Sequence, residues 1–149
     1  MSIIQEQLGA AAIVFKKEDG QPHWLLIRAC GENCWKFPKQ ISTKAESTVR
    51  TCLRKIERVA GSHSQVLEEV GRARVSVDAG KTSRPALTIY YLLRNRKSDD
   101  IPFAILDKGE IAWLSFQSAY ARLALETEKK FLSTANRLLR QIDPSETPV

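Results

Sequence analysis

The sequence predicts an α+β fold in which a mixed β-sheet is sandwiched between helices, an α/β/α arrangement. Two observations predict it. Apolar segments with the length and composition of strands occur at 9–17, 23–29 and 86–94. Between and after them, apolar residues recur at helical spacing. The 149 residues can bury one core without staples, so we expect a single domain over 1–149, with its core over about 8–142 and a flexible tail at 143–149.

The first part of the chain predicts a hairpin followed by a helix. The segments GAAAIVFKK (9–17) and HWLLIRA (23–29) are separated by a turn on Asp19-Gly20, so we expect them to pair. A short extended piece at 35–37 ends at Pro38. Helical spacing starts from Ser47, and Gly61 suits the C-cap of this helix. Its apolar stripe consists of Val49, Cys52, Leu53, Ile56 and Ala60.

The remaining elements follow in a simple order. A half-buried strand is expected over 66–77, a loop over 79–85, a central strand over 86–94 and a short strand over 110–114. Because successive side chains of a strand point to opposite faces, Tyr90 and Tyr91 should face different sides of the sheet. Ser115 can cap a short helix over 116–123. A longer helix follows, whose apolar face contains Phe131, Leu132, Ala135, Leu138, Leu139 and Ile142.

Composition limits the classes of function. The net charge of +6 favours anionic partners such as nucleotides, nucleic acid or acidic proteins. No apolar run approaches the ~20 residues of a membrane span, and the N-terminus lacks the pattern of a secretion signal. Cys30, Cys34 and Cys52 form an odd set without a disulfide or zinc-finger spacing. We therefore expect free thiols, a cytoplasmic location and no membrane association.

The order of elements, with W-x-F-P-K at 35–39 and E-x-x-W-L at 110–114, resembles that of the Nudix hydrolases, most closely the diadenosine tetraphosphate hydrolase branch. The hallmark of that superfamily is the box G-x5-E-x7-R-E-U-x-E-E-x-G-U, where U is aliphatic. Laid on this sequence without gaps, the box matches at Glu46, Arg54, Ile56 and Gly61. It departs at Gln40, Lys55, Arg58, Val59 and Ser62.

The departures fall on the metal-binding chemistry that the resemblance implies. In such hydrolases the box helix presents carboxylates that hold Mg²⁺ against a pyrophosphate. Mg²⁺ requires hard oxygen ligands, whereas Lys55, Arg58 and Val59 offer an ammonium, a guanidinium and an isopropyl group. At an effective dielectric of ~20, like unit charges ~4 Å apart repel by about 4 kcal/mol. We expect no cofactor, and Mg²⁺ only if the chain is an active enzyme.

Basic residues supply the candidate ligand-binding groups. Arg50, Arg54 and Arg58 recur every four residues, with Lys55 beside them, and form either a solvated face or a direct phosphate contact. The resemblance adds Lys39 as a phosphate contact. Arg28 is a candidate for the same cleft. The resemblance also places a base-stacking tyrosine near Tyr90, with Lys81 from the preceding loop beside it.

Three acids are the candidates for catalysis if the chain is active: Glu46, Glu57 and Glu110. A structural interpretation stands beside each. Glu46 is expected to pair with Arg50, Glu57 with Arg54 or another neighbour, and Glu110 to lie at a strand edge. A general base must reach a water that lies on the phosphorus, and isolated acids without metal do so poorly.

These observations favour an impaired Nudix-type protein, a pseudoenzyme that binds a nucleotide or another phosphorylated ligand. The first alternative is an active hydrolase of a substrate such as a dinucleoside polyphosphate, with a displaced metal site. The second is a basic domain that binds nucleic acid through residues including Arg72, Arg74, Arg94, Arg96 and Lys97. The sequence gives no indication of the oligomeric state.

Overall fold

The structure is a computed structural model, and it describes residues 7–29, 33–43, 45–61, 63–79, 82–96 and 109–142. The tail at 143–149, whose flexibility was expected, lies outside these ranges. None of the described helices is both long and apolar enough to cross a membrane. The elements, in chain order, are β1 (Leu8–Glu18), β2 (Gln21–Ala29), β3 (Lys39–Ile41), α1 (Thr48–Ala60), β4 (Ser64–Ala79), β5 (Thr82–Asn95), β6 (Gly109–Leu114), α2 (Phe116–Arg122) and α3 (Glu126–Ile142).

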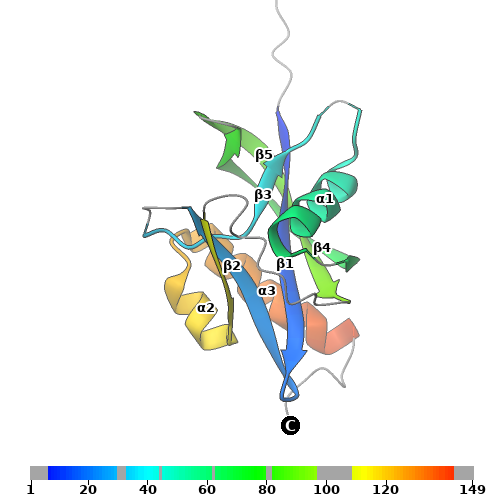
Figure 1. Cartoon of the computed structure of the whole chain (residues 1–149), viewed down its shortest axis with the longest axis vertical. Coiled ribbons are helices and arrows are strands. Elements are labelled where there is room, and N and C mark those ends of the chain that lie inside the picture. Colours follow the sequence, from blue (N-terminus) through cyan, green and yellow to red (C-terminus); the bar gives the residue numbers. More distant parts are fainter. Residues whose placement is uncertain are drawn as a thin grey trace, which may run out of the picture.

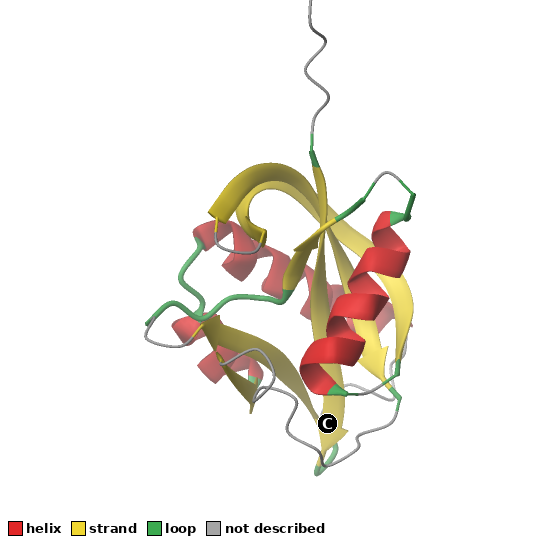
Figure 2. Ribbon diagram, turned by 45° about the horizontal axis from the view of Figure 1, so that its top comes forward, coloured by secondary structure: helices red, strands yellow, loops and turns green. Residues whose placement is uncertain are grey.

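The predicted fold class is confirmed: a mixed sheet lies between helices on its two faces. The strand order is β4-β5-β1-β2-β6, with β3 paired to β1. Among the described strands, only the β1–β5 pair is parallel, and the other pairs are antiparallel. Helix α1 crosses the near face of the sheet, and α3 crosses the far face (Figure 1). A view turned by 45° shows the same layers, with α2 on the side of α3 (Figure 2).

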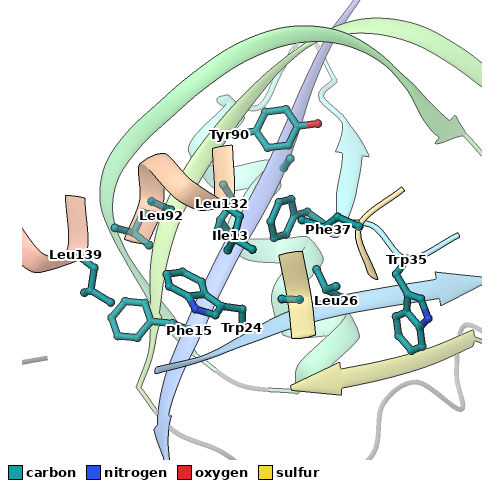
Figure 3. Close-up of a cluster of buried hydrophobic side chains, with 14 residues drawn as sticks. Ile13, Phe15, Trp24, Leu26, Trp35, Phe37, Tyr90, Leu92, Leu132 and Leu139 are labelled. Atoms are coloured by element: carbon teal, nitrogen blue, oxygen red, sulfur yellow. The ribbon is translucent and has the colours of Figure 1, made fainter. Parts of the chain in front are cut away.

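The two faces of the sheet bury separate apolar clusters because strand side chains alternate. On the side of α2 and α3, the cluster contains Phe15, Trp24, Phe37, Tyr90 and Leu132, among others (Figure 3). On the side of α1, residues next to these in sequence form the second cluster, whose members include Val14, Leu25, Cys52, Ile56 and Tyr91. Tyr90 and Tyr91 therefore face opposite sides, as predicted.

The β1–β2 hairpin forms as expected from its turn. Asp19 (φ 52°) and Gly20 (φ 78°) adopt the left-handed backbone that tight hairpin turns require. The strands pair in the register Phe15↔Trp24 and Lys16↔His23. The extended piece expected at 35–37 makes only isolated bridges, and the strand proper, β3, begins after Pro38.

The β4–β5 hairpin is longer than the sequence indicates. Residues 82–85, predicted as loop, continue β5 and pair with the end of β4, where Ser76 lies opposite Pro85. Pro85 is tolerated because the pairing of β1 with β5 starts only at Leu87, so the other edge of β5 is open there. Figure 2 shows this end of the hairpin arching over the sheet.

Register shifts between Val66 and Glu68 and between Glu69 and Gly71 mark irregular pairing in β4, which α3 contacts. A Cβ on Gly71 would lie 2.5 Å from Cε1 of Phe131. Glycine at this position thus allows the Phe131 ring to approach the strand closely and to contact Tyr90, with 4.6 Å between ring centroids. This packing sets α3 against the sheet next to the buried Tyr90.

Candidate functional site

Helix α1, which contains most of the residues aligned with the predicted box, has well-formed ends. The Ser47 side chain accepts a hydrogen bond from the Arg50 backbone N at 3.2 Å, and this is a standard N-cap. Gly61 closes the helix in the left-handed conformation (φ 64°), and its N–H donates to the Glu57 carbonyl at 2.9 Å. The predicted C-cap is confirmed, and the structure adds Ser47 as the N-cap. The two caps fix the register of the helix and therefore which residues it buries.

The buried face of α1 differs in part from the predicted stripe. Val49 is exposed and Leu53 only half-buried, whereas Thr51 and Val59 are buried. Cys52 and Ile56 lie at the centre of the face, as expected, and burial raises the pKa of the Cys52 thiol. The predicted apolar stripe is therefore wrong at its edges. The buried face of α1 is centred on Cys52, Ile56 and Val59, which are spaced i, i+4 and i+7, and Val49 lies outside it.

Glu46 and Arg54, the two charged residues that match the box, bind each other. The Arg54 guanidinium donates to both carboxylate oxygens of Glu46, at 2.7 and 3.0 Å. The Thr51 hydroxyl also donates to Glu46 at 2.7 Å. The hydrogen bonds from Arg54 and then Thr51 hold the pKa of the Glu46 carboxyl below its ordinary value.

The predicted pairing of Glu46 with Arg50 is therefore wrong. Glu57 was expected to pair with Arg54 or another neighbour, and of these Arg54 binds Glu46. Because Glu46 precedes the N-cap Ser47, it is not on the helix, so helical i, i+4 spacing does not apply to it. The chain before the cap instead brings its carboxylate alongside Arg54, in the second turn.

The residues at the three predicted box positions that lack acids do not fit a magnesium ion. Val59 is 4% exposed and packs in the cluster between α1 and the sheet. Arg58 is exposed and Lys55 half-buried, and each carries a positive charge. The retained acid, Glu46, has both oxygens engaged by Arg54. This set of side chains offers Mg²⁺ repulsion rather than oxygen ligands.

The other two acids lie elsewhere. The Glu110 carboxylate accepts from the Arg28 guanidinium at 2.6 Å, because the two residues face each other across the β2–β6 pair. Glu57 is exposed on α1. Within the described ranges, no group of three or more His, Cys, Asp or Glu side chains is placed to hold a metal ion.

Arg28 does not share a surface with α1. Its guanidinium lies 4.8 Å from the ring centroid of Trp35, which belongs to the cluster on the side of α2 and α3. Arg122 from α2 also approaches the Trp35 ring, at 5.9 Å. The neighbouring Ile27 faces the α1 side instead. Arg28, Glu110 and Trp35 thus form a group of their own at the β2–β6 edge.

Lys39 and Tyr90 come together, but inside the protein. The Lys39 ammonium donates to the Glu128 carboxylate at 2.5 Å and to the Phe37 carbonyl at 3.1 Å. The Tyr90 hydroxyl donates to the same Glu128 oxygen at 2.6 Å. Burial lowers the pKa of Lys39, an effect opposed by Glu128, and burial together with that negative charge raises the pKa of Tyr90. Figure 3 shows Tyr90 beside Phe37 and Leu132.

Glu128, the centre of this buried network, was missed by the sequence prediction. A signal for it exists: Glu128 lies at i, i+4, i+7 and i+11 spacing with Leu132, Ala135 and Leu139, the buried face of α3. An acidic side chain on the buried, apolar face of a helix requires a buried hydrogen-bonding or charged partner. Tyr91 was also overlooked as a polar contact, although its hydroxyl lies 2.6 Å from that of Thr48 in the first turn of α1.

The structure thus separates the predicted ligand residues into three groups. Arg50, Arg54, Lys55 and Arg58 are on α1, Arg28 is at the β2–β6 edge, and Lys39 and Tyr90 are in the buried network. Lys81 lies outside the described residues. Of these groups, only the one on α1 combines several exposed cations in one place, so the basic face of α1, meaning Arg50, Arg54, Lys55 and Arg58, is the candidate functional site.

Comparisons with known proteins identify the fold. No protein-family model matches the sequence, and no curated protein matches it significantly. Among solved structures, an Ap4A hydrolase from C. elegans in a binary complex superimposes with a TM-score of 0.74 and 16% identity, covering 91% of this chain and 98% of that one. A NUDIX hydrolase from Nitrosomonas europaea gives a TM-score of 0.64 at 15% identity, with coverage of 89% and 90%.

A UDP-X diphosphatase is also similar, with a TM-score of 0.64 and 14% identity over 94% of this chain and 67% of that one. The match to these structures extends over nearly the whole chain, at identities that establish the fold alone. The architecture is therefore the Nudix fold, as the resemblance of the sequence implied.

Proposed function

We propose that this Nudix-fold chain binds a phosphorylated small molecule on the basic face of α1 and does not hydrolyse it by metal-dependent chemistry. The observation behind this proposal is the set of contacts made by the four residues that match the box. Glu46 and Arg54 pair with each other, Ile56 is fully buried, and Gly61 caps the helix. Each retained residue has a structural contact that needs no metal.

Two further observations support a phosphate ligand. The similar structures are named as hydrolases of phosphorylated compounds, Ap4A and UDP-X, which makes a ligand of that class a reasonable one for this chain. The Arg54 guanidinium already holds an oxyanion, the Glu46 carboxylate, through two hydrogen bonds. Guanidinium groups bind phosphate in the same two-pronged way, without a bridging metal.

The test is binding measured with and without magnesium. We would titrate the chain by calorimetry and thermal shift with nucleoside di- and triphosphates, dinucleoside polyphosphates and sugar nucleotides, in EDTA and in MgCl₂. At a free ligand concentration of about 100 times the Kd, a true ligand should stabilise the protein by about 2.7 kcal/mol. The effect should persist in EDTA and be weakened by Arg50→Ala, but not by Arg137→Ala on α3.

Two results would overturn the proposal. If no phosphorylated compound stabilises the protein, it does not bind this class of ligand. If Mg²⁺- or Mn²⁺-dependent release of a nucleotide or phosphate product is observed, and Glu57→Gln abolishes it, the chain is an active hydrolase with a displaced metal site.

A further inference from the structure

Three hydrogen-bond donors from two distant parts of the chain converge on one carboxylate inside the protein. The Lys39 ammonium and the Tyr90 hydroxyl donate to the same oxygen of Glu128, at 2.5 and 2.6 Å. The Phe37 backbone N–H donates to the other oxygen at 3.3 Å. The three donors therefore form an oxyanion site, and the chain fills this site with one of its own side chains.

The site is enclosed by the protein. The Glu128 side chain is fully buried and that of Lys39 is 5% exposed. The Tyr90 ring meets the Phe37 ring edge-on, with 6.4 Å between their centroids, and Leu132 lies beside them (Figure 3). Because these neighbours are apolar, a donor here that loses its acceptor stays unsatisfied, at a cost in free energy. The three donors thus require an acceptor at this position.

The geometry and charge of the donors match a carboxylate. A carboxylate has two oxygens, and each oxygen of Glu128 accepts at least one hydrogen bond here. Its single negative charge balances the ammonium of Lys39. A doubly charged phosphate would bring further oxygens and a second negative charge into apolar surroundings, where an unbalanced charge is costly. The site therefore selects a singly charged group with two oxygens.

Helix α3 supplies this carboxylate from its first turn. Glu128 is the buried residue of that turn, and the other buried residues, Leu132, Ala135 and Leu139, follow later in the helix. A binding group that is carried on the same chain has a high effective concentration at its site. A free carboxylate in solution must compete with that concentration, so the intact chain should exclude it.

We propose that Lys39, Tyr90 and the Phe37 N–H form a binding site for a small monocarboxylate, which the chain keeps closed by inserting Glu128 from α3. Removal of the Glu128 carboxylate should open the site. Glu128→Ala removes a terminal CH₂–COO⁻ group, which has the same heavy atoms as acetate, so acetate is the matching probe. The site is separate from the basic face of α1, and the inference does not rest on the function proposed above.

The experiment titrates Glu128→Ala and the parent chain with sodium acetate, with sodium chloride added to keep the ionic strength constant. The backbone amide resonance of Phe37 should shift saturably in the variant and stay unchanged in the parent. Formate leaves part of the space empty and propionate overfills it, so both should bind more weakly than acetate. At a free acetate concentration of about 100 times the Kd, the folding equilibrium constant of the variant should rise about 100-fold, measured by urea unfolding.

Matched variants separate binding at this site from general effects of acetate on protein stability. Glu126→Ala removes the same atoms from the same turn, at a side chain that is 86% exposed, and should respond to acetate as the parent does. Lys39→Met/Glu128→Ala lacks the ammonium and should not bind acetate. Tyr90→Phe/Glu128→Ala lacks one donor to a charged acceptor and should bind acetate at least about tenfold more weakly than Glu128→Ala.

Each possible failure has its own signature. If Glu128→Ala is unfolded in chloride, recovery of the native circular dichroism spectrum in acetate replaces the amide shift as the expected result. Refolding no better in acetate than in chloride would then contradict the inference. Saturable binding that persists in Lys39→Met/Glu128→Ala would place the acetate elsewhere. A saturable shift of the Phe37 amide in the parent would show that Glu128 does not close the site.

Discussion

The carboxylate of Glu128 receives hydrogen bonds from segments that are far apart in the sequence. The Phe37 backbone N–H belongs to the segment before β3, and Lys39 is the first residue of β3. Tyr90 comes from the middle of β5. The Glu128 side chain is fully buried, and that of Lys39 is 5% exposed. At the residue scale, these contacts explain why Lys39 and Tyr90 are present without assigning them a ligand: each satisfies the other buried polar groups.

Removal of the Glu128 charge should therefore destabilise the protein strongly. Glu128→Gln leaves the Lys39 ammonium buried without a counter-charge, which costs about 3–5 kcal/mol. Urea unfolding monitored by circular dichroism would measure the loss. Glu126→Gln, on the same helix with its side chain 86% exposed, should change stability by less than about 0.5 kcal/mol.

A triple variant tests the cause of this loss. Lys39→Met/Tyr90→Phe/Glu128→Leu removes the charges and the hydroxyl together, and apolar replacement of a buried ion pair is often close to neutral. It should be more stable than Glu128→Gln alone. A triple variant as unstable as Glu128→Gln would mean that the shape of these side chains, rather than the unpaired charge, causes the loss.

At the scale of elements, the packing of α1 determines which of the predicted box positions can accept an acid. Val59 packs among apolar side chains between α1 and the sheet, whereas the neighbouring Arg58 points to solvent. Val59→Glu should cost about 3–5 kcal/mol, because it places an uncompensated carboxylate in that cluster. Arg58→Glu should cost less than about 1 kcal/mol, as exposed substitutions usually do.

The pH dependence identifies the mechanism of that loss. Burial raises the folded-state pKa of a carboxyl above its unfolded value. The unfolded state then gains relative stability as pH rises above that unfolded value, so the Val59→Glu variant should be less stable at pH 8 than at pH 5, relative to the parent chain. Equal losses at both pH values would indicate a steric effect instead, and no loss at either would show that α1 tolerates an acid there.

Element types and caps followed from the sequence, whereas side-chain partners did not. Gly61 and the Asp19-Gly20 turn act through the local backbone, so their positions in the sequence were enough to predict the C-terminal end of α1 and the β1–β2 hairpin. The contacts of Glu46 with Arg54 and of Lys39 with Glu128 depend on where the chain returns in space. Neither the spacing of residues in the sequence nor the resemblance to a family gives such long-range contacts. The candidate ligand residues, which were predicted from both, therefore lie in three separate groups in the structure.

At the scale of the whole molecule, the two apolar clusters share the central strands. Along β1 and β5, alternate residues contribute to opposite clusters: Ile13 and Leu92 to the α3 side, Val14 and Leu93 to the α1 side. Strands β1 and β5 are also paired in parallel along eight positions, from Leu8↔Leu87 to Phe15↔Arg94. Loss of packing in one helical layer would therefore expose one face of strands whose other face packs against the opposite layer.

This sharing predicts one cooperative unfolding transition for substitutions on either face. Ile56→Val, under α1, should cost about 0.5–1.5 kcal/mol, and Leu132→Ala, under α3, about 2–5 kcal/mol. Both side chains are fully buried, in different clusters, so the costs should add in the double variant. If Trp113, which packs against the α1-side cluster, is replaced by Phe in every variant, tryptophan fluorescence reports on Trp24 and Trp35 in the α3-side cluster. This signal should shift together with far-UV circular dichroism in every variant. Val49→Ala, at an exposed position of α1, is the control with little effect. If Ile56→Val moved the circular dichroism midpoint but left the fluorescence midpoint unchanged, the α1 layer would unfold independently and the shared strands would not couple the two clusters.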